Sequence, residues 1–113
     1  MWNLHFYKIK MNLSQENWVK SIEGSKKTLI LDVRTQHEFD EGHIEKSKNL
    51  DFFNAQLFLD EILKLNKELS IHIYCRSGSR SLQACELLKQ MGFVKVFNLE
   101  GGIEKWNGNL IAD

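Results

Sequence analysis

One cysteine of the chain stands where an apolar run meets a short polar segment. Residues 73–81 read IYCRSGSRS, so Cys75 precedes six residues that are only Arg, Ser or Gly. The thiolate is the reactive form of cysteine, and nearby arginines and the N–H groups at a helix start stabilise it. Arg76 and Arg80 supply two positive charges close to Cys75 in the sequence. The pattern predicts a nucleophilic cysteine rather than a small buried apolar residue.

The residues that follow Cys75 suit a ring of backbone N–H groups around an anion. Gly78 can adopt a positive φ, which a tight turn with inward-facing N–H groups often requires. Ser77 and Ser79 add hydroxyl donors with little bulk. We expect this ring to hold an anion about the size of a sulfur atom or a tetrahedral oxyanion.

The remaining cysteine and the histidines give no sign of a disulfide framework or a metal site. The chain has two cysteines, and Cys85 lies on an apolar helical stripe, where we expect it to pack in the core. The histidines are scattered, without the spacing of a metal pair on one helix turn, at His5, His37, His43 and His72. We therefore expect no metal and no cofactor. His72 stands on a predicted strand and is expected to face solvent.

The composition is that of one globular domain, residues 1–113, with 42% hydrophobic and 27% charged residues. The formal net charge is zero, so no global field would recruit nucleic acid or a membrane surface. The first 13 residues lack the apolar core of a signal peptide, and no stretch resembles a membrane span. We expect a cytoplasmic monomer that binds neither nucleic acid nor membranes.

Apolar runs alternate with helical patterns along the chain. Strands are predicted at 28–33, 48–52, 70–75 and 94–99, with a short edge strand within 5–13, and helices at 14–24, 37–41, 54–69, 79–91 and 101–106. Ser14 is the predicted N-cap of the first helix. This alternation predicts an α/β fold with a parallel sheet and helices on both faces. Sites in such sheets form at the carboxyl ends of strands, where Asp32 and Cys75 both stand.

Three segments of the chain together resemble the rhodanese-like domain family. They are LILDVRTQHEFDEGHI at 29–44, IYCRSGSRS at 73–81 and VFNLEGGIEKW at 96–106. The resemblance covers about residues 13–106 and implies a parallel five-stranded sheet flanked by helices on both faces, with residues 1–12 as an edge strand or an extension. The family usually continues Gly-His-Ile with Pro-Gly-Ala, whereas this chain has Glu45, Lys46 and Ser47. That departure leaves the conformation of this turn open.

The resemblance also implies a sulfurtransferase in which Cys75 carries a persulfide. The donor would be thiosulfate or a small persulfide, the acceptor a thiol or cyanide, and a protein persulfide is an alternative partner. Arg76 is expected to point outward and draw in an anionic donor, whereas Arg80 either does the same or braces the loop against a carboxylate. Two other functions stay open, namely a non-catalytic partner-binding module and a phosphatase or arsenate reductase. Phosphatases and arsenate reductases of similar fold are described by a loop one residue longer than residues 75–80. The shorter loop of this chain therefore favours sulfur.

Several residues outside the loop are assigned supporting roles. Asp32 either orders the loop by accepting hydrogen bonds, caps a helix or pairs with Arg34. Glu38 is expected to form a salt bridge with Arg34 or with Arg80. His43, which matches the Gly-His-Ile of the family, is expected to be a hydrogen-bonded structural residue, and Trp106 to pack in the core.

Overall fold

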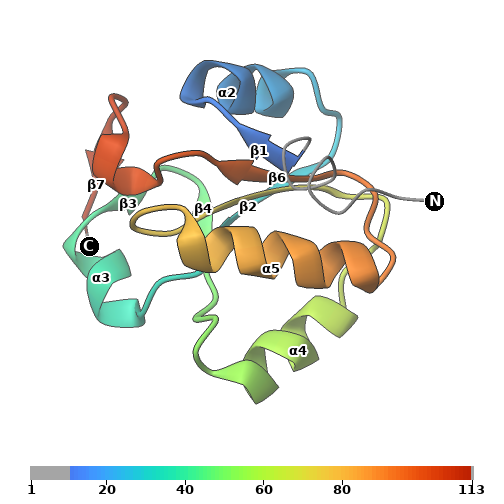
Figure 1. The fold of residues 1–113 in the computed structure, drawn as a ribbon. Helices are drawn as coiled ribbons and strands as arrows, with labels where there is room; N and C mark the ends of the chain where they lie inside the picture. Colours follow the sequence, from blue (N-terminus) through green and yellow to red (C-terminus); the bar gives the residue numbers. More distant parts are fainter. Residues whose placement is uncertain (1–10, 113) are drawn as a thin grey trace.

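A five-stranded parallel sheet forms the centre of the computed structural model, which describes residues 11–112 (Figure 1). The strands are β1 (Asn12–Leu13), β2 (Thr28–Asp32), β4 (Ser47–Asn49), β5 (Ser70–Tyr74) and β6 (Val96–Leu99). Their order across the sheet is β1-β6-β5-β2-β4, with every pairing parallel. The predicted α/β fold and its parallel sheet are confirmed.

Strand β5 lies in the middle of this sheet, which explains why even its polar residues Ser70 and His72 are buried. All five of its residues are buried, because neighbouring strands and helices cover both of its faces. Asp32 of β2 is in register with Tyr74 of β5. Cys75 follows Tyr74 directly, so it emerges at the same sheet edge as the end of β2.

Helices cover both faces of the sheet, as predicted (Figure 1). On one face lie α4 (Ala55–Leu63) and α5 (Ser79–Gln90); on the other lie α2 (Gln15–Glu23) and the 3-10 helix η1 (Ile103–Lys105). Helix α3 (Gln36–Glu41) and an antiparallel pair, β3 (His43–Ile44) with β7 (Leu110–Ile111), flank the carboxyl edge. The buried apolar residues form two clusters, one on each face. The first contains Phe58, Ile62, Ala84, Cys85 and Leu88, and the second Trp18, Tyr74 and Leu99.

The caps of the helices explain where several of them begin and end. Ser14 accepts a hydrogen bond from the backbone N–H of Asn17, so the predicted N-cap of α2 is confirmed. Thr35 and Glu38 form a capping box at the start of α3. Gly92 follows the last turn of α5 with a φ of 101°, a conformation that favours glycine.

Some predicted boundaries are wrong for local reasons. The helix predicted to reach residue 69 ends at Leu63, because the Asn66 side chain accepts a hydrogen bond from the N–H of Glu68 and stabilises a turn instead. The strand predicted at 48–52 is β4, one residue earlier and shorter. The pairing of β3 with β7 was not predicted, since strands of two residues carry no periodic signal. Of the edge strand expected within 5–13, Asn12–Leu13 forms β1, and residues 5–10 lie outside the described residues.

The prediction that His72 faces solvent is wrong. Its exposed fraction is 0%, because it lies on the central strand β5 with its ring against Trp18 and Phe97. Its Nε2 lies 3.0 Å from the hydroxyl of Ser21 on α2. Among residues 11–112, no helix has the length and apolar character needed to cross a membrane.

Candidate active site

Cys75 stands directly after β5, with its sulfur held by three donors. The backbone N–H of Gly78 lies 3.1 Å from Sγ, and the backbone N–H and hydroxyl of Ser81 lie 3.4 Å and 3.3 Å from it. The exposed fraction of Cys75 is 1%, so a reacting atom must approach through the loop. Hydrogen bonds that a sulfur accepts stabilise its anionic form. Three donors thus surround the Cys75 sulfur on the side of the loop and of α5.

The loop after Cys75 leaves several backbone donors free. Gly78 has a φ of 102°, as predicted, and a Cβ here would lie 3.3 Å from the N of Gly101. In the described part of the chain, the backbone N–H groups of residues 76, 77, 79 and 80 form no hydrogen bond. Helix α5 begins at Ser79 and directs its positive end to this loop. The loop thus has unused donors and a favourable field for an anion.

The hydroxyl donor to the sulfur is Ser81, which sequence reasoning missed. Ser77 and Ser79 were expected to supply hydroxyl groups, but both are exposed and neither donates to Cys75. Ser81 is fully buried in the first turn of α5. The first N–H groups of a helix have no intrahelical acceptor and are free to bind the sulfur. A small polar residue in that turn can add a hydroxyl donor, and this signal could have identified Ser81.

Arg80 is bound to a carboxylate, which was one of its two expected roles. Its guanidinium donates to the carboxylate of Glu38 on α3 at 3.1 Å and 3.3 Å, and it lies 5.2 Å from the ring centre of Phe53. The hydrogen bond from Arg80, together with donors from Thr35, lowers the pKa of Glu38 to about 2 despite its partial burial. Of the two salt bridges expected for Glu38, the one with Arg80 forms. It ties the end of the loop to α3.

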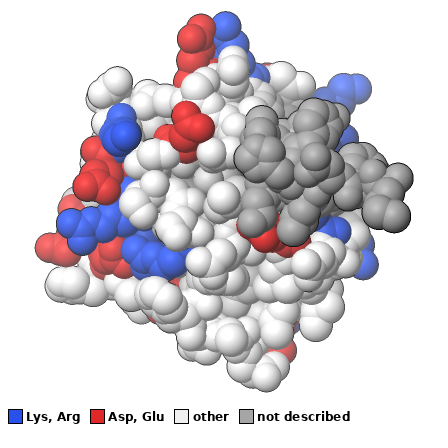
Figure 2. Space-filling view, viewed as in Figure 1, with Lys and Arg blue, Asp and Glu red and all other residues white. Residues whose placement is uncertain are grey.

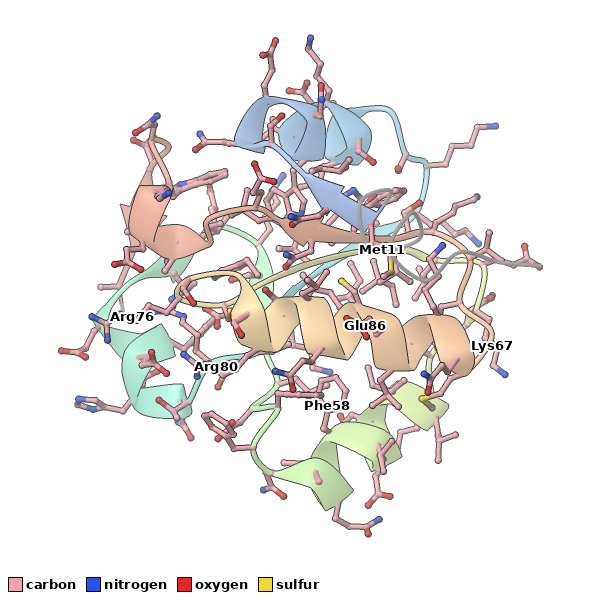
Figure 3. All side chains as sticks on the ribbon, in the orientation of Figure 1. Met11, Phe58, Lys67, Arg76, Arg80 and Glu86 are labelled. Atoms are coloured by element: carbon pink, nitrogen blue, oxygen red, sulfur yellow. The ribbon has the colours of Figure 1, made fainter. Side chains whose placement is uncertain are left out.

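Arg76 points away from the loop, toward the outside of the molecule (Figure 3). It lines an open pocket together with Arg34, Glu38, Glu41, Gly42, Ile103, Glu104 and Leu110. Figure 2 shows basic and acidic side chains intermixed over this side of the molecule. Arg34 pairs with Asp32, so among the described residues Arg76 is the arginine of this pocket that forms no ion pair.

Asp32 pairs with Arg34 rather than with the loop. The Arg34 Nη2 lies 2.6 Å from Oδ2 of Asp32, and the Arg34 backbone N–H donates to Oδ1 at 3.0 Å. The same Nη2 donates to the carbonyl oxygen of Gly42 at 2.7 Å. Within residues 11–112, the Asp32 carboxylate accepts nothing from residues 76–80. The pair therefore joins the end of β2 to the turn after α3, beside the loop.

Three neighbouring features have structural roles. The Nδ1 of His43 lies 2.8 Å from the carbonyl oxygen of Phe39, whose ring stacks on it, as expected of a hydrogen-bonded histidine. The turn left open by the sequence is closed by Lys46 at a φ of 70° and by the Ser47 hydroxyl, which donates to the carbonyl of Ile44. Trp106 packs against the second apolar cluster. No group of three potential metal ligands occurs among the described residues.

Comparison with known proteins identifies the family. The model of the rhodanese-like domain matches residues 15–109. A protein of Allochromatium vinosum named sulfurtransferase is 35% identical over 83% of this chain and 85% of its own. The tRNA uridine(34) hydroxylase of Pelagibacter ubique is 33% identical over 88% of this chain, which spans 33% of that longer protein. The solved rhodanese-like domain protein from Staphylococcus aureus is 27% identical, has a TM-score of 0.75, and is similar over 90% of this chain and 97% of its own.

The chain therefore belongs to the rhodanese-like domain family, as its three motifs predicted. Its relatives support a role in sulfur transfer in general. They occur both as short proteins of similar length and as parts of longer ones with other names.

Proposed function

We propose that this protein is a sulfurtransferase that carries a sulfane sulfur on Cys75. The observation that supports this most directly is the environment of the Cys75 sulfur. It accepts hydrogen bonds from Gly78 and Ser81, and four further N–H groups of the loop have no acceptor within the described residues. Before the reaction, such a site would stabilise the anionic sulfur of Cys75. After the reaction, it would stabilise the negative charge on the transferred sulfur.

The first step is attack of the Cys75 thiolate on the outer sulfur of a donor. With thiosulfate, the new bond joins the cysteine sulfur to the outer sulfur, and the sulfur–sulfur bond of the donor breaks. Its electron pair leaves with sulfite, and Cys75 becomes an anionic persulfide. In this proposal Cys75 reacts as its thiolate, so the step needs no separate general base. The free N–H groups of residues 76–80 would hold the charge on the outer sulfur.

The second step is removal of the outer sulfur by a nucleophile. A thiolate acceptor forms a bond to the outer sulfur and leaves as a persulfide, whereas cyanide leaves as thiocyanate. In both cases the electron pair of the breaking bond returns to Cys75 as a thiolate. No electrons are gained or lost in the complete cycle, so the reaction needs no redox cofactor.

Arg76 is the residue that we propose draws in an anionic donor. It is exposed at the edge of the site and forms no ion pair within residues 11–112, whereas Arg80 is bound to Glu38. Since Cys75 is 1% exposed, a donor would insert only its terminal sulfur into the loop. Thiosulfate, a small persulfide and a persulfide at the end of a protein segment all fit this requirement.

A single-turnover assay tests the proposal. Protein mixed with thiosulfate should release one sulfite per molecule, and cyanide added after the unreacted thiosulfate has been removed should release one thiocyanate. Cys75→Ala should release neither, while Cys85→Ala, the matched control at the buried cysteine, should behave as the natural protein. If thiosulfate and a glutathione persulfide both give no transfer, the proposal fails and a partner-binding module becomes the better explanation.

A further inference from the structure

Helix η1 binds two carbonyl groups of the loop from outside. The N–H of Ile103 donates to the carbonyl oxygen of Cys75 at 2.9 Å, and that of Glu104 to the carbonyl oxygen of Arg76 at 3.0 Å. In a trans peptide the carbonyl and the following N–H point in opposite directions. No cis peptide occurs in the described residues. The N–H groups of Arg76 and Ser77 must therefore point away from η1.

Asn98 on β6 donates to a further carbonyl of the loop, that of Gly78, which also accepts from the backbone N–H of Leu82 at 3.2 Å. The exposed fraction of Asn98 is 2%, and its Nδ2 donates to the carbonyl oxygen of Gly78 at 3.3 Å. The same Nδ2 donates to Oδ1 of Asn12 at 2.8 Å, and Asn12 in turn donates to Glu100. Because both oxygens require a donor, these contacts fix the orientation of the Asn98 amide. The N–H of Ser79, which follows the Gly78 carbonyl, is thereby turned away from Asn98.

Two adjacent glycines distinguish this contact from ordinary packing. Both have a positive φ, 80° at Gly101 and 63° at Gly102. A Cβ at Gly102 would clash with the carbonyl oxygens of Arg76 and Cys75, whereas the atoms nearest to a Cβ at Gly101 belong to the side chain of Lys105, the first at 2.9 Å. The close approach to the loop therefore requires glycine at 102 alone.

We propose that Asn98, Gly102 and the N–H groups of Ile103 and Glu104 form an outer clamp that directs the loop N–H groups around Cys75. In this account Asn98 and Gly102 are positioning residues that act through the loop backbone without touching the sulfur. The proposal deepens the proposed sulfurtransferase function, on which it rests for the identity of the bound atom. It also predicts how fast the free thiol of Cys75 is alkylated, which can be measured without any sulfur donor.

The clamp is tested by the rate at which iodoacetamide alkylates Cys75, measured across a range of pH in a Cys85→Ala background. Gly102→Ala displaces the two carbonyls, so the rate near neutral pH should fall roughly tenfold, about the effect of one lost hydrogen bond to a charged group. The pH profile should also move to higher pH. Gly101→Ala also places a Cβ on a residue of positive φ, but it should alkylate within about twofold of the parent.

Asn98→Leu is a second variant that keeps the fold of the η1 segment. It removes the side-chain donor to the Gly78 carbonyl, which keeps its hydrogen bond from the N–H of Leu82, while retaining a similar volume. It should slow alkylation by roughly threefold to tenfold. The clamp is overturned if Gly102→Ala and Asn98→Leu both alkylate like Gly101→Ala. If Gly102→Ala does not fold, the alkylation rate of Asn98→Leu relative to Gly101→Ala alone tests the clamp. Slow alkylation in these variants, with no sulfur transfer by the parent, would support the clamp and reject the proposed function.

Discussion

The hydroxyl of Ser81 lies 3.3 Å from the sulfur of Cys75, and the backbone N–H of the same serine lies 3.4 Å from it. One residue in the first turn of α5 therefore binds the sulfur with both its side chain and its backbone. Because Ser81 is fully buried, water cannot replace its hydroxyl without rearrangement. The reactivity of the cysteine is thus coupled to the position of α5.

Replacing Ser81 by alanine should slow persulfide formation while leaving the fold intact. The variant loses one hydrogen bond to an anionic sulfur, and we expect the single-turnover rate to fall roughly tenfold. Ser77→Ala is the matched control, since Ser77 is exposed in the same loop and makes no contact with the sulfur. Equal rates for the two variants, measured by sulfite release, would mean that the Ser81 hydroxyl is not required.

Much of the fold could be predicted because its strands and motifs are local in the sequence. The apolar runs at 28–33 and 70–75 identify buried strands, and the residues after Cys75 identify a turn that needs glycine. The burial of His72 was not predictable in this way, because it depends on which strand occupies the centre of the sheet. That order follows from pairing between distant segments.

The parts of the site that the sequence did not reveal come from distant segments. Asn98 and Gly102 reach the loop because β6 lies beside β5, more than twenty residues later in the chain than Cys75. Neither residue type indicates chemistry by itself. The partner of Arg80 was predicted only as one of two alternatives, since the choice depends on how α3 packs beside the loop.

Removing the charge of Asp32 should be strongly destabilising. Asp32 is 0% and Arg34 6% exposed, so Asp32→Asn leaves a buried guanidinium without its carboxylate. We expect a loss of about 3–5 kcal/mol in the free energy of unfolding, measured by denaturant titration. In the double variant Asp32→Asn with Arg34→Met, the loss should be smaller than the sum of the two single losses. Additive losses would show that the two side chains do not stabilise each other.

The salt bridge between Glu38 and Arg80 should persist well into acid. The pKa of Glu38 is lowered from 4.5 to about 2, so its stabilising effect is complete above pH 4.5 and is lost as the pH falls toward 2. Glu38→Gln should lower the free energy of unfolding by up to about 1 kcal/mol near neutral pH, since both side chains are partly exposed. The difference in stability between the variant and the parent should shrink as the pH falls from about 4.5 toward 2. A difference that does not depend on pH would contradict the role of the charge.

His72 should make the protein less stable in mild acid. Burial lowers the pKa of His72 from 6.5 to about 4, so between these values the unfolded chain binds a proton that the folded protein does not. Stability is therefore highest above pH 6.5 and falls as the pH decreases toward 4. His72 alone should lower the free energy of unfolding by about 1 kcal/mol when the pH falls from about 7.5 to about 5.5.

His72→Gln is the control for this effect, because glutamine does not titrate and can still reach the hydroxyl of Ser21. Chemical denaturation of both proteins at the two pH values isolates the histidine. The loss should be smaller in His72→Gln by about 1 kcal/mol. Equal losses in the two proteins would show that His72 is not the group responsible.

The central claim is that Cys75 carries a sulfur atom, and intact mass measures this directly. The purified protein, Cys75→Ala and Cys85→Ala are each incubated with thiosulfate and, separately, with a glutathione persulfide, and then weighed before and after treatment with cyanide. We predict a gain of one sulfur atom in the natural protein and in Cys85→Ala, reversed by cyanide, and no gain in Cys75→Ala. No gain with either donor, or a gain that persists in Cys75→Ala, would contradict the assignment of Cys75 as the sulfur carrier.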